Sequence, residues 1–171
     1  MGQRSGTVTM KGNPLTLEGS ELAIGQPAPD FKLTGNDLSD VALNMFKGKV
    51  LVISCVPSLD TPVCDLETRR FNKEAEKLGN NVAILTVSMD LPFAQKRWCG
   101  LANATCVLTA SDYRDASFAK AYGVLIKELH LLARAIFIVD LKGVVRYIQL
   151  VKEVTNEPDY NAVLDALKKI V

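Results

Sequence analysis

The residues best suited to chemistry lie in the segment from Pro57 to Cys64. Thr61 and Pro62 fit the N-cap and the first position of a helix, so Cys64 falls in its first turn. The free N–H groups and partial positive charge of a helix N-terminus favour an anion, which here means a nucleophilic thiolate. Free cysteine is also often buried as a small hydrophobic residue. Position alone leaves both interpretations of Cys64 open.

The residues around Cys64 decide how well the segment suits a reactive sulfur. Thr61 stands three residues before the cysteine, where its hydroxyl can lie beside the sulfur and a substrate oxygen. Pro57 and Pro62 restrict the loop and shield a thiolate from water. Asp65 acts in the opposite sense, because a neighbouring carboxylate disfavours a second negative charge unless its side chain points to solvent.

The other candidate ligands and nucleophiles are three further cysteines and one histidine, His130. Cysteines at positions 55, 64, 99 and 106 form no Cys-x-x-Cys or Cys/His pair with zinc-ligand spacing. Cys55 falls inside an apolar run and Cys106 at the start of another, which predicts that both are structural. No serine nucleophile elbow accompanies His130, and the chain contains neither GxGxxG nor a P-loop. The residues therefore predict no metal and no nucleotide cofactor.

The elements that must position these residues follow an α/β pattern, with apolar runs alternating with helical periodicity from about residue 30. The continuous apolar run 50–56 predicts a central strand covered on both faces. The helix from Pro62 has an inward face that continues from Cys64 to Leu78 and a solvated face that includes Glu67. Further predicted elements are an N-terminal hairpin at about 7–18, strands 82–88 and 106–108, helices 92–99, 117–122 and 159–169, and a hairpin of strands 135–139 and 144–148. This order is typical of a thioredoxin-like fold, although periodicity alone also permits other small α/β sheets.

Length and charge limit the organisation and the partners of the chain. The 171 residues predict a single domain spanning 1–171. With 20 Lys and Arg against 19 Asp and Glu, the net charge of +1 gives no strong field for nucleic acid or anionic lipid. The N-terminus lacks the apolar stretch of a signal peptide, and Arg134 and Asp140 interrupt the later apolar segments. We expect a cytoplasmic protein with reduced cysteines and with neither nucleic-acid nor membrane partners.

The spacing Pro57-x-x-x-Thr61-x-x-Cys64 matches the PxxxTxxC pattern of the peroxiredoxins. Nearly the whole chain resembles their bacterial thiol peroxidase subfamily, most closely in segments 58–64, 90–95, 111–115, 132–135 and 156–160. The resemblance implies that Cys64 is the peroxidatic cysteine, Cys99 the resolving cysteine, Thr61 the hydroxyl that orients peroxide and Arg134 the guanidinium near the thiolate. The residues alone also permit a salt bridge between Arg134 and a carboxylate, and a buried Cys99 beside the neighbouring tryptophan.

The same resemblance implies a central mixed sheet flanked by helices and a thiol-dependent peroxidase acting on hydrogen peroxide and organic, above all alkyl, hydroperoxides. It implies an intramolecular Cys64–Cys99 disulfide, recycling by a thioredoxin-like dithiol, a homodimer, and no metal, haem or flavin. A competing hypothesis is a non-enzymatic redox sensor or holdase that uses the same disulfide as a switch. Because the two cysteines fall on separate predicted helices, we expect local unwinding before their sulfurs meet.

Overall fold

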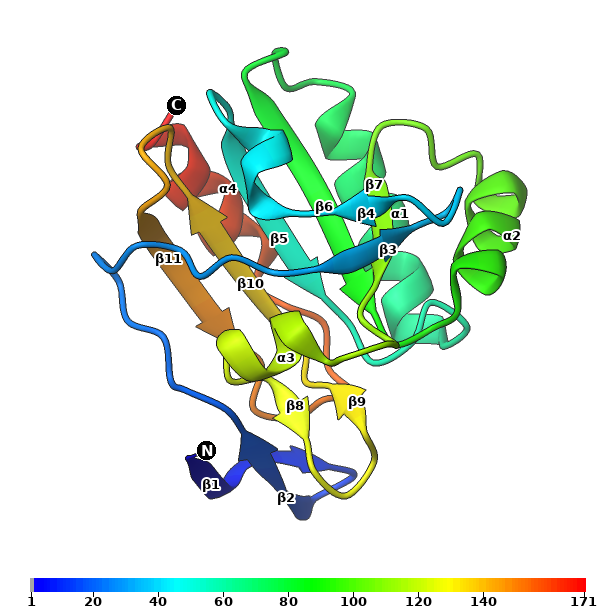
Figure 1. Ribbon diagram of the computed structural model, residues 1–171, viewed down its shortest axis with the longest axis vertical. Helices are drawn as coiled ribbons and strands as arrows, with labels where there is room; N and C mark the ends of the chain where they lie inside the picture. Colours follow the sequence, from blue (N-terminus) through cyan, green and yellow to red (C-terminus); the bar gives the residue numbers. More distant parts are fainter. Residues whose placement is uncertain (1) are drawn as a thin grey trace.

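A seven-stranded mixed sheet forms the body of the computed structural model, which describes residues 2–171 (Figure 1). Across this large sheet the strands are β11 (Val145–Leu150), β10 (Ala135–Val139), β5 (Val50–Cys55), β6 (Val82–Ser88), β7 (Leu108–Ser111), β3 (Leu33–Gly35) and β4 (Asp40–Val41). A small sheet contains β1 (Gln3–Met10), β2 (Asn13–Glu18), β8 (Leu125–Ile126) and β9 (Leu131–Leu132). The small sheet lies at one end of the molecule, at the bottom of Figure 1.

The β5–α1–β6 unit supplies the parallel centre of the large sheet, with α1 (Pro62–Ala75) as the crossover. The register of β5 and β6 runs from Val50 opposite Val82 to Cys55 opposite Val87. β7 continues this parallel part, whereas β10 pairs antiparallel with both β5 and β11. The predicted thioredoxin-like arrangement, with a central strand at β5 and a late hairpin, is confirmed.

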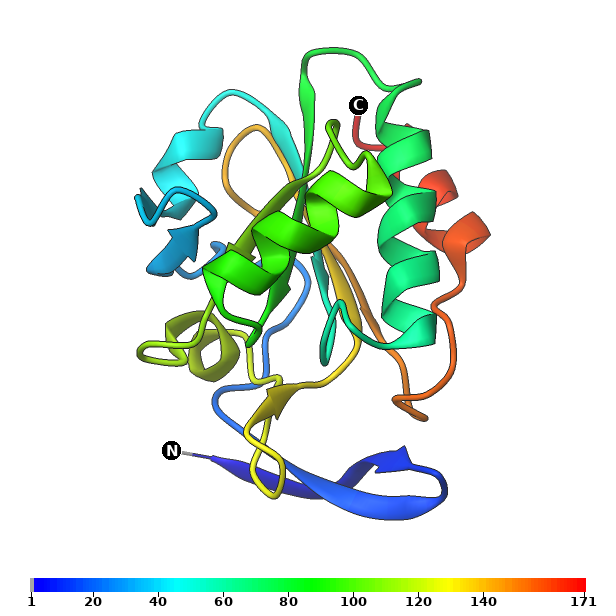
Figure 2. The ribbon, with the colours of Figure 1, turned by 90° about the vertical axis from the view of Figure 1, so that its right-hand side faces the viewer.

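Helices cover both faces of the large sheet. They are α1, α2 (Pro92–Ala102), α3 (Ser117–Ala121), α4 (Tyr160–Lys168) and the 3-10 helix η1 (Leu43–Phe46). Val50 and Val52 of β5 belong to the core cluster that includes Phe71 of α1 and residues of α2 and α4 (Figure 2). Leu51 and Ile53 belong to the opposite cluster, which includes residues of α3, η1 and the N-terminal hairpin. Both faces of β5 are thus buried, which explains its uninterrupted apolar sequence.

The N-terminal hairpin is longer than predicted, since β1 begins at Gln3. Its turn consists of Lys11 and Gly12, with φ angles of 51° and 78°, a left-handed geometry that favours glycine. β8 pairs with β2 through Leu17 and Ile126, and β9 completes the small sheet. The sequence did not predict β8 or β9, because strands of two residues carry no periodic pattern.

Several predicted boundaries near the site are wrong, and the third strand is the clearest case. β7 begins at Leu108, because the N–H groups of Cys106 and Val107 donate to Oδ1 of Asn72 at 2.8 and 3.2 Å. The Asn72 side chain thus accepts the hydrogen bonds that these backbone N–H groups would otherwise donate to a neighbouring strand. Cys106 is therefore exposed rather than set in apolar surroundings. Among the helices, α1 ends at Ala75, three residues early, and α2 continues three residues beyond its predicted end.

Candidate active site

The loop after β5 leads directly into α1 and places Cys64 in the first turn of that helix. Thr61 is the N-cap and Pro62 the first helical residue, as predicted. The Cys64 side chain is fully buried and packs with Val56 and Leu59. The start of this 14-residue helix brings unpaired backbone N–H groups and the positive end of the helix dipole to the same turn. This setting stabilises an anionic sulfur.

Thr61 and Pro57 lie in the segment that leads from β5 to Cys64. The Thr61 hydroxyl donates to the carbonyl oxygen of Ser58 at 2.8 Å, instead of capping the helix. Since its only hydrogen is used there, the Thr61 oxygen remains available as an acceptor. Pro57 is buried directly after β5, whereas Thr61 is exposed.

Arg134, immediately before β10, is the cation that contacts Cys64. Its Nη2 donates to Sγ of Cys64 at 3.3 Å. Its Nη1 donates to Glu67, and its Nε donates to the carbonyl oxygen of Val154 at 3.1 Å. These three anchors hold the planar guanidinium in one orientation inside the protein, with 2% of the residue exposed. Arg134 thus contacts the Cys64 sulfur and also forms the salt bridge that the sequence allowed.

Glu67 is fully buried, so its prediction as a solvated residue is wrong. Its Oε1 accepts from the Ser54 hydroxyl at 2.7 Å, while Oε2 pairs with Arg134. Burial raises the pKa of the Glu67 carboxyl, and the Arg134 charge and the Ser54 hydroxyl offset part of this rise. Burial also opposes the charge of Arg134, but Glu67 and Cys64 outweigh it and raise the pKa of Arg134. The one available sequence signal was the three-residue spacing from Cys64, which puts Glu67 on the same helix face.

Asp90, two residues after the end of β6, holds the loop between β5 and α1 in place. Its Oδ1 accepts from the Ser58 hydroxyl at 2.6 Å, and its Oδ2 accepts from the Leu59 N–H and the Ser88 hydroxyl, both at 2.7 Å. One carboxylate thus joins the carboxyl ends of two neighbouring parallel strands. Nothing in the local sequence singles out Asp90 for this role.

Cys99 lies on α2, next to the helix that carries Cys64 (Figure 2). Its Sγ is 3.3 Å from Oγ1 of Thr109 and 3.8 Å from Nδ2 of Asn36, which also donates to Thr109 at 2.9 Å. Cys99 is half-buried, and both it and Cys64 are free thiols. Each sulfur therefore has its own partners, Arg134 for Cys64 and Thr109 for Cys99.

The comparison with protein families assigns this arrangement to a known group. The model of the Redoxin family matches residues 23–164, which include every residue of the site described above. The chain belongs to the redoxin family.

Among the redoxins, the chain is similar to thiol peroxidases over almost its whole length. It is 54% identical over 162 residues to the thiol peroxidase of Halalkalibacterium halodurans, covering 95% of this chain and 97% of the relative. It is 52% identical over 164 residues to the thiol peroxidase of Bacillus subtilis, covering 96% and 98%. The crystal structure of a peroxiredoxin-like protein from Aquifex aeolicus matches with a TM-score of 0.91 and 46% identity, covering 97% and 98%. This redoxin is therefore a member of the thiol peroxidase group of peroxiredoxins.

The remaining two cysteines of this redoxin have surroundings unlike that of Cys64. Cys55 is fully buried in β5, and its Sγ donates to the carbonyl oxygens of Ala133 and Ala135, both at 3.3 Å. Burial raises the pKa of the Cys55 thiol, so the thiol form is retained. Cys106 is exposed, with its Sγ 3.8 Å from the Thr105 hydroxyl.

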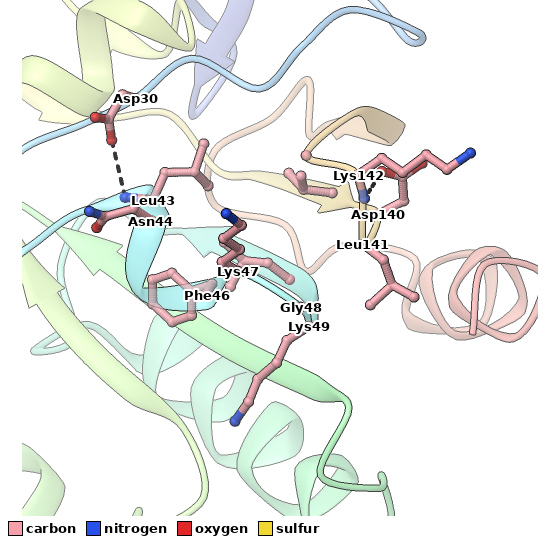
Figure 3. A pocket seen from close by; sticks show the side chains of 13 residues that line it. Asp30, Leu43, Asn44, Phe46, Lys47, Gly48, Lys49, Asp140, Leu141 and Lys142 are labelled. Atoms are coloured by element: carbon pink, nitrogen blue, oxygen red, sulfur yellow. Dashed lines mark hydrogen bonds between the residues drawn. The ribbon is translucent and has the colours of Figure 1, made fainter.

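A separate hollow lies at the opposite end of the large sheet, between η1 and the turn that joins β10 and β11 (Figure 3). It is bordered by Phe46, Lys47 and Lys49, which precede β5, whereas Cys64 follows β5. None of the 13 described residues that line it is a cysteine. Across residues 2–171, no three His, Cys, Asp or Glu side chains are grouped so that they could hold a metal ion. No helix in that described range is long and apolar enough to span a membrane.

Proposed function

We propose that this thiol-dependent peroxidase reduces hydrogen peroxide and organic hydroperoxides with Cys64 as its nucleophile. The observation that carries this proposal is the 3.3 Å hydrogen bond from Arg134 Nη2 to Cys64 Sγ in the first turn of α1. A permanent cation and a helix N-terminus converge on a single sulfur, which is the environment that a reactive thiolate requires.

In the first step, the Cys64 thiolate attacks one peroxide oxygen in line with the O–O bond. The S–O bond forms as the O–O bond breaks, which leaves a sulfenic acid on Cys64 and an alkoxide or hydroxide. The leaving oxygen takes up a proton and departs as alcohol or water. Arg134 stabilises the charge that develops on this oxygen, and the free acceptor of Thr61 orients the peroxide through its O–H. Pro57 shields the reacting sulfur from water.

In the second step, the Cys99 thiol attacks the sulfenic sulfur of Cys64. The S–S bond forms, and the hydroxyl leaves with the thiol proton as water. A thioredoxin-like dithiol then reduces the disulfide, becomes a disulfide itself and restores both thiols. The cycle consumes one peroxide and one dithiol and needs no bound cofactor.

We also infer a cytoplasmic homodimer whose subunits are single domains, with neither nucleic acid nor membrane as a partner. The near-neutral net charge of +1 supports the exclusion of polyanionic partners. The single family match over residues 23–164 supports the single domain.

The decisive experiment is a peroxide-consumption assay with thioredoxin as the dithiol donor. We expect Cys64→Ser to abolish turnover and to retain the fold, because serine has a similar volume and does not ionise near pH 7. Cys55→Ser and Cys106→Ser are the matched controls and should remain active. Near wild-type turnover by Cys64→Ser would show that another residue is the nucleophile.

The same assay separates the peroxidase from the redox sensor or holdase. A peroxidase consumes many peroxide equivalents for each chain while the dithiol lasts. A switch without turnover consumes a single equivalent and stops.

A further inference from the structure

A direct hydrogen bond joins the residues that neighbour the two cysteines. The indole Nε1 of Trp98 donates to Oδ1 of Asp65 at 2.8 Å. Asp65 follows Cys64 on α1, and Trp98 precedes Cys99 on α2. The hydrogen bond thus connects α1 and α2 next to the two cysteines of the proposed disulfide.

Arg69 strengthens this connection between α1 and α2. Its Nε lies 2.9 Å from both carboxylate oxygens of Asp65, and its guanidinium lies 5.6 Å from the centre of the Trp98 ring. Its Nη1 also donates to the carbonyl oxygen of Ala102, at the end of α2, at 3.4 Å. These contacts explain how a carboxylate is accommodated next to Cys64. Arg69 balances the charge of Asp65, and the carboxylate accepts a hydrogen bond from Trp98.

The Trp98 ring also helps to enclose the reactive sulfur. It packs against the small buried cluster of Val56, Leu59 and Cys64. The ring also borders a hollow of about 340 Å³, lined in part by Leu59 and Leu101. The hollow leaves space next to the Trp98 ring.

Formation of the disulfide requires this arrangement to change. Cys64 Sγ is held by Arg134, and Cys99 Sγ contacts Thr109 on β7. The sulfurs must leave these partners to reach the bond length of about 2.05 Å. Asp65 and Trp98 are each one peptide bond from a cysteine, so they move with it.

We propose that the Asp65–Trp98 hydrogen bond, braced by Arg69, is a latch that limits the rate of disulfide formation. Asp65 and Trp98 are positioning residues for the second step of the reaction. They hold α1 and α2 in the arrangement that accepts peroxide, and their separation permits Cys99 to approach the sulfenic acid. This inference rests on the proposed function and adds a residue pair that controls one of its steps.

The latch also influences the fate of the sulfenic acid. A second peroxide can react with it before Cys99 arrives, giving a sulfinic acid and water or alcohol. A slower closure lengthens the life of the sulfenic acid and favours this side reaction. Loss of the latch must therefore protect Cys64 against overoxidation.

The test compares Asp65→Ala, Trp98→Phe and the double variant with wild type. Trp98→Phe keeps one aromatic ring but removes the N–H donor together with part of the indole, whereas Asp65→Ala removes the acceptor and leaves the indole in place. The rates of sulfenic acid formation and of disulfide closure are measured separately by rapid quenching, thiol alkylation and mass spectrometry. Glu74→Gln is the matched control, because it removes a 3.1 Å ion pair with Lys77 near the far end of α1.

We expect closure to accelerate by about tenfold in each single variant, with less sulfinic acid formed at high peroxide, and no change of closure in Glu74→Gln. The double variant should close no faster than either single variant, since both changes remove the same bond. The latch proposal would be contradicted if the rate of disulfide closure were unchanged in both single variants. It would also be contradicted if the effects of the two substitutions on this rate multiplied fully in the double variant. Absence of a Cys64–Cys99 disulfide in oxidised wild type would instead contradict the proposed function, so the two failures are distinguishable.

Discussion

At the scale of single residues, the buried pair of Arg134 and Glu67 is the unusual feature of the site. Removing two charges from water costs several kcal/mol for each ion, and their attraction repays this only with good geometry and further hydrogen bonds. Here the further bonds come from Ser54, Val154 and the Cys64 sulfur. Glu67 therefore balances the buried charge of Arg134 and helps to orient its guanidinium toward Cys64.

We predict that Arg134→Met slows the first peroxide reaction by about 100- to 1000-fold, the loss typical of one preorganised transition-state donor, ~3–4 kcal/mol. It should also lower the free energy of unfolding by ~3–5 kcal/mol, since Glu67 is left buried without its cation. Stopped-flow kinetics and urea unfolding measure the two effects. Arg146→Met is the control, because Arg146 is partly exposed and pairs with Asp140. A first step of unchanged rate would remove Arg134 from the active site.

Thr61→Val tests the acceptor role of the exposed hydroxyl. Valine keeps the shape of threonine but cannot bond the peroxide O–H, so we expect the first step to slow by one to several orders of magnitude, up to ~4 kcal/mol. Its effect on stability should be small, because the hydroxyl binds Ser58 rather than the helix N-terminus. Stopped-flow kinetics provides the measurement, with the exposed Thr105→Val as control. Equal rates in both variants would exclude a role for Thr61.

At the scale of secondary structure, the elements that hold the site could be predicted where their signals are local. The apolar runs of β5, β6 and β10 and the start of α1 at Thr61-Pro62 are visible in the sequence itself. β3, β4, β8 and β9 have two or three residues each, and their pairing depends on distant parts of the chain. The start of β7 was misplaced because Asn72, more than 30 residues away, takes the backbone donors of Cys106 and Val107.

The site residues show the same contrast between local signals, which can be predicted, and contacts between distant parts of the chain, which cannot. Local spacing was enough to predict that a helix begins after Thr61 and that Cys64 lies in its first turn. A charged residue at position 67 is normally solvated, and only its partner 67 residues later explains its burial. Asp65 and Trp98 are likewise 33 residues apart, so no sequence window contains both.

Disulfide formation is predicted to change α1 and α2 more than the strands. Cys64 and Cys99 lie on separate helices with separate partners, so the first turn of α1 and much of α2 must unwind locally. We expect amide exchange in residues 60–66 and 92–100 to be faster in the disulfide form than in the reduced form. Exchange in the central strand β5 should not change. Identical exchange patterns in both redox states would show that the thiols are resolved in another way.

At the scale of the whole molecule, the N-terminal hairpin is connected to the active site through β11 and the loop that follows it. The Val154 N–H donates to the carbonyl oxygen of Thr9 at 2.8 Å, and the Val154 carbonyl accepts from Arg134 Nε at 3.1 Å. The hairpin, shown in blue at the bottom of Figure 1, thus helps to place the carbonyl that accepts a hydrogen bond from the Arg134 guanidinium. A remote sheet contributes to the geometry at Cys64.

Glu153 holds the N-terminal hairpin against the loop that follows β11. Its carboxylate accepts from the Thr9 hydroxyl at 2.8 Å and from the N–H groups of Lys11 and Gly12, at 2.9 and 3.1 Å, in the hairpin turn. Together with the Thr155 hydroxyl, which has the largest effect, these donors lower the pKa of Glu153. A carboxyl whose pKa is lowered by folding stabilises the folded state above its ordinary pKa, and this contribution is lost as the pH falls.

The contact between the hairpin and the Glu153 carboxylate should therefore weaken progressively as the pH falls below about 4.3, the ordinary pKa of a glutamate, at which a free carboxyl is half protonated. In Glu153→Gln the side chain carries no charge at any pH, so the Gly12 amide should already be less protected against hydrogen exchange at pH 7. Between pH 6 and pH 3 this protection should change less in the variant than in wild type. Because Val154 follows Glu153 and holds Arg134, the first peroxide step should slow several-fold in the same variant. Hydrogen exchange and stopped-flow kinetics measure both effects, with Asp165→Asn on the exposed side of α4 as control. Wild-type protection of Gly12 in Glu153→Gln would show that the apolar contacts of Val8 and Leu17 dock the hairpin without the carboxylate.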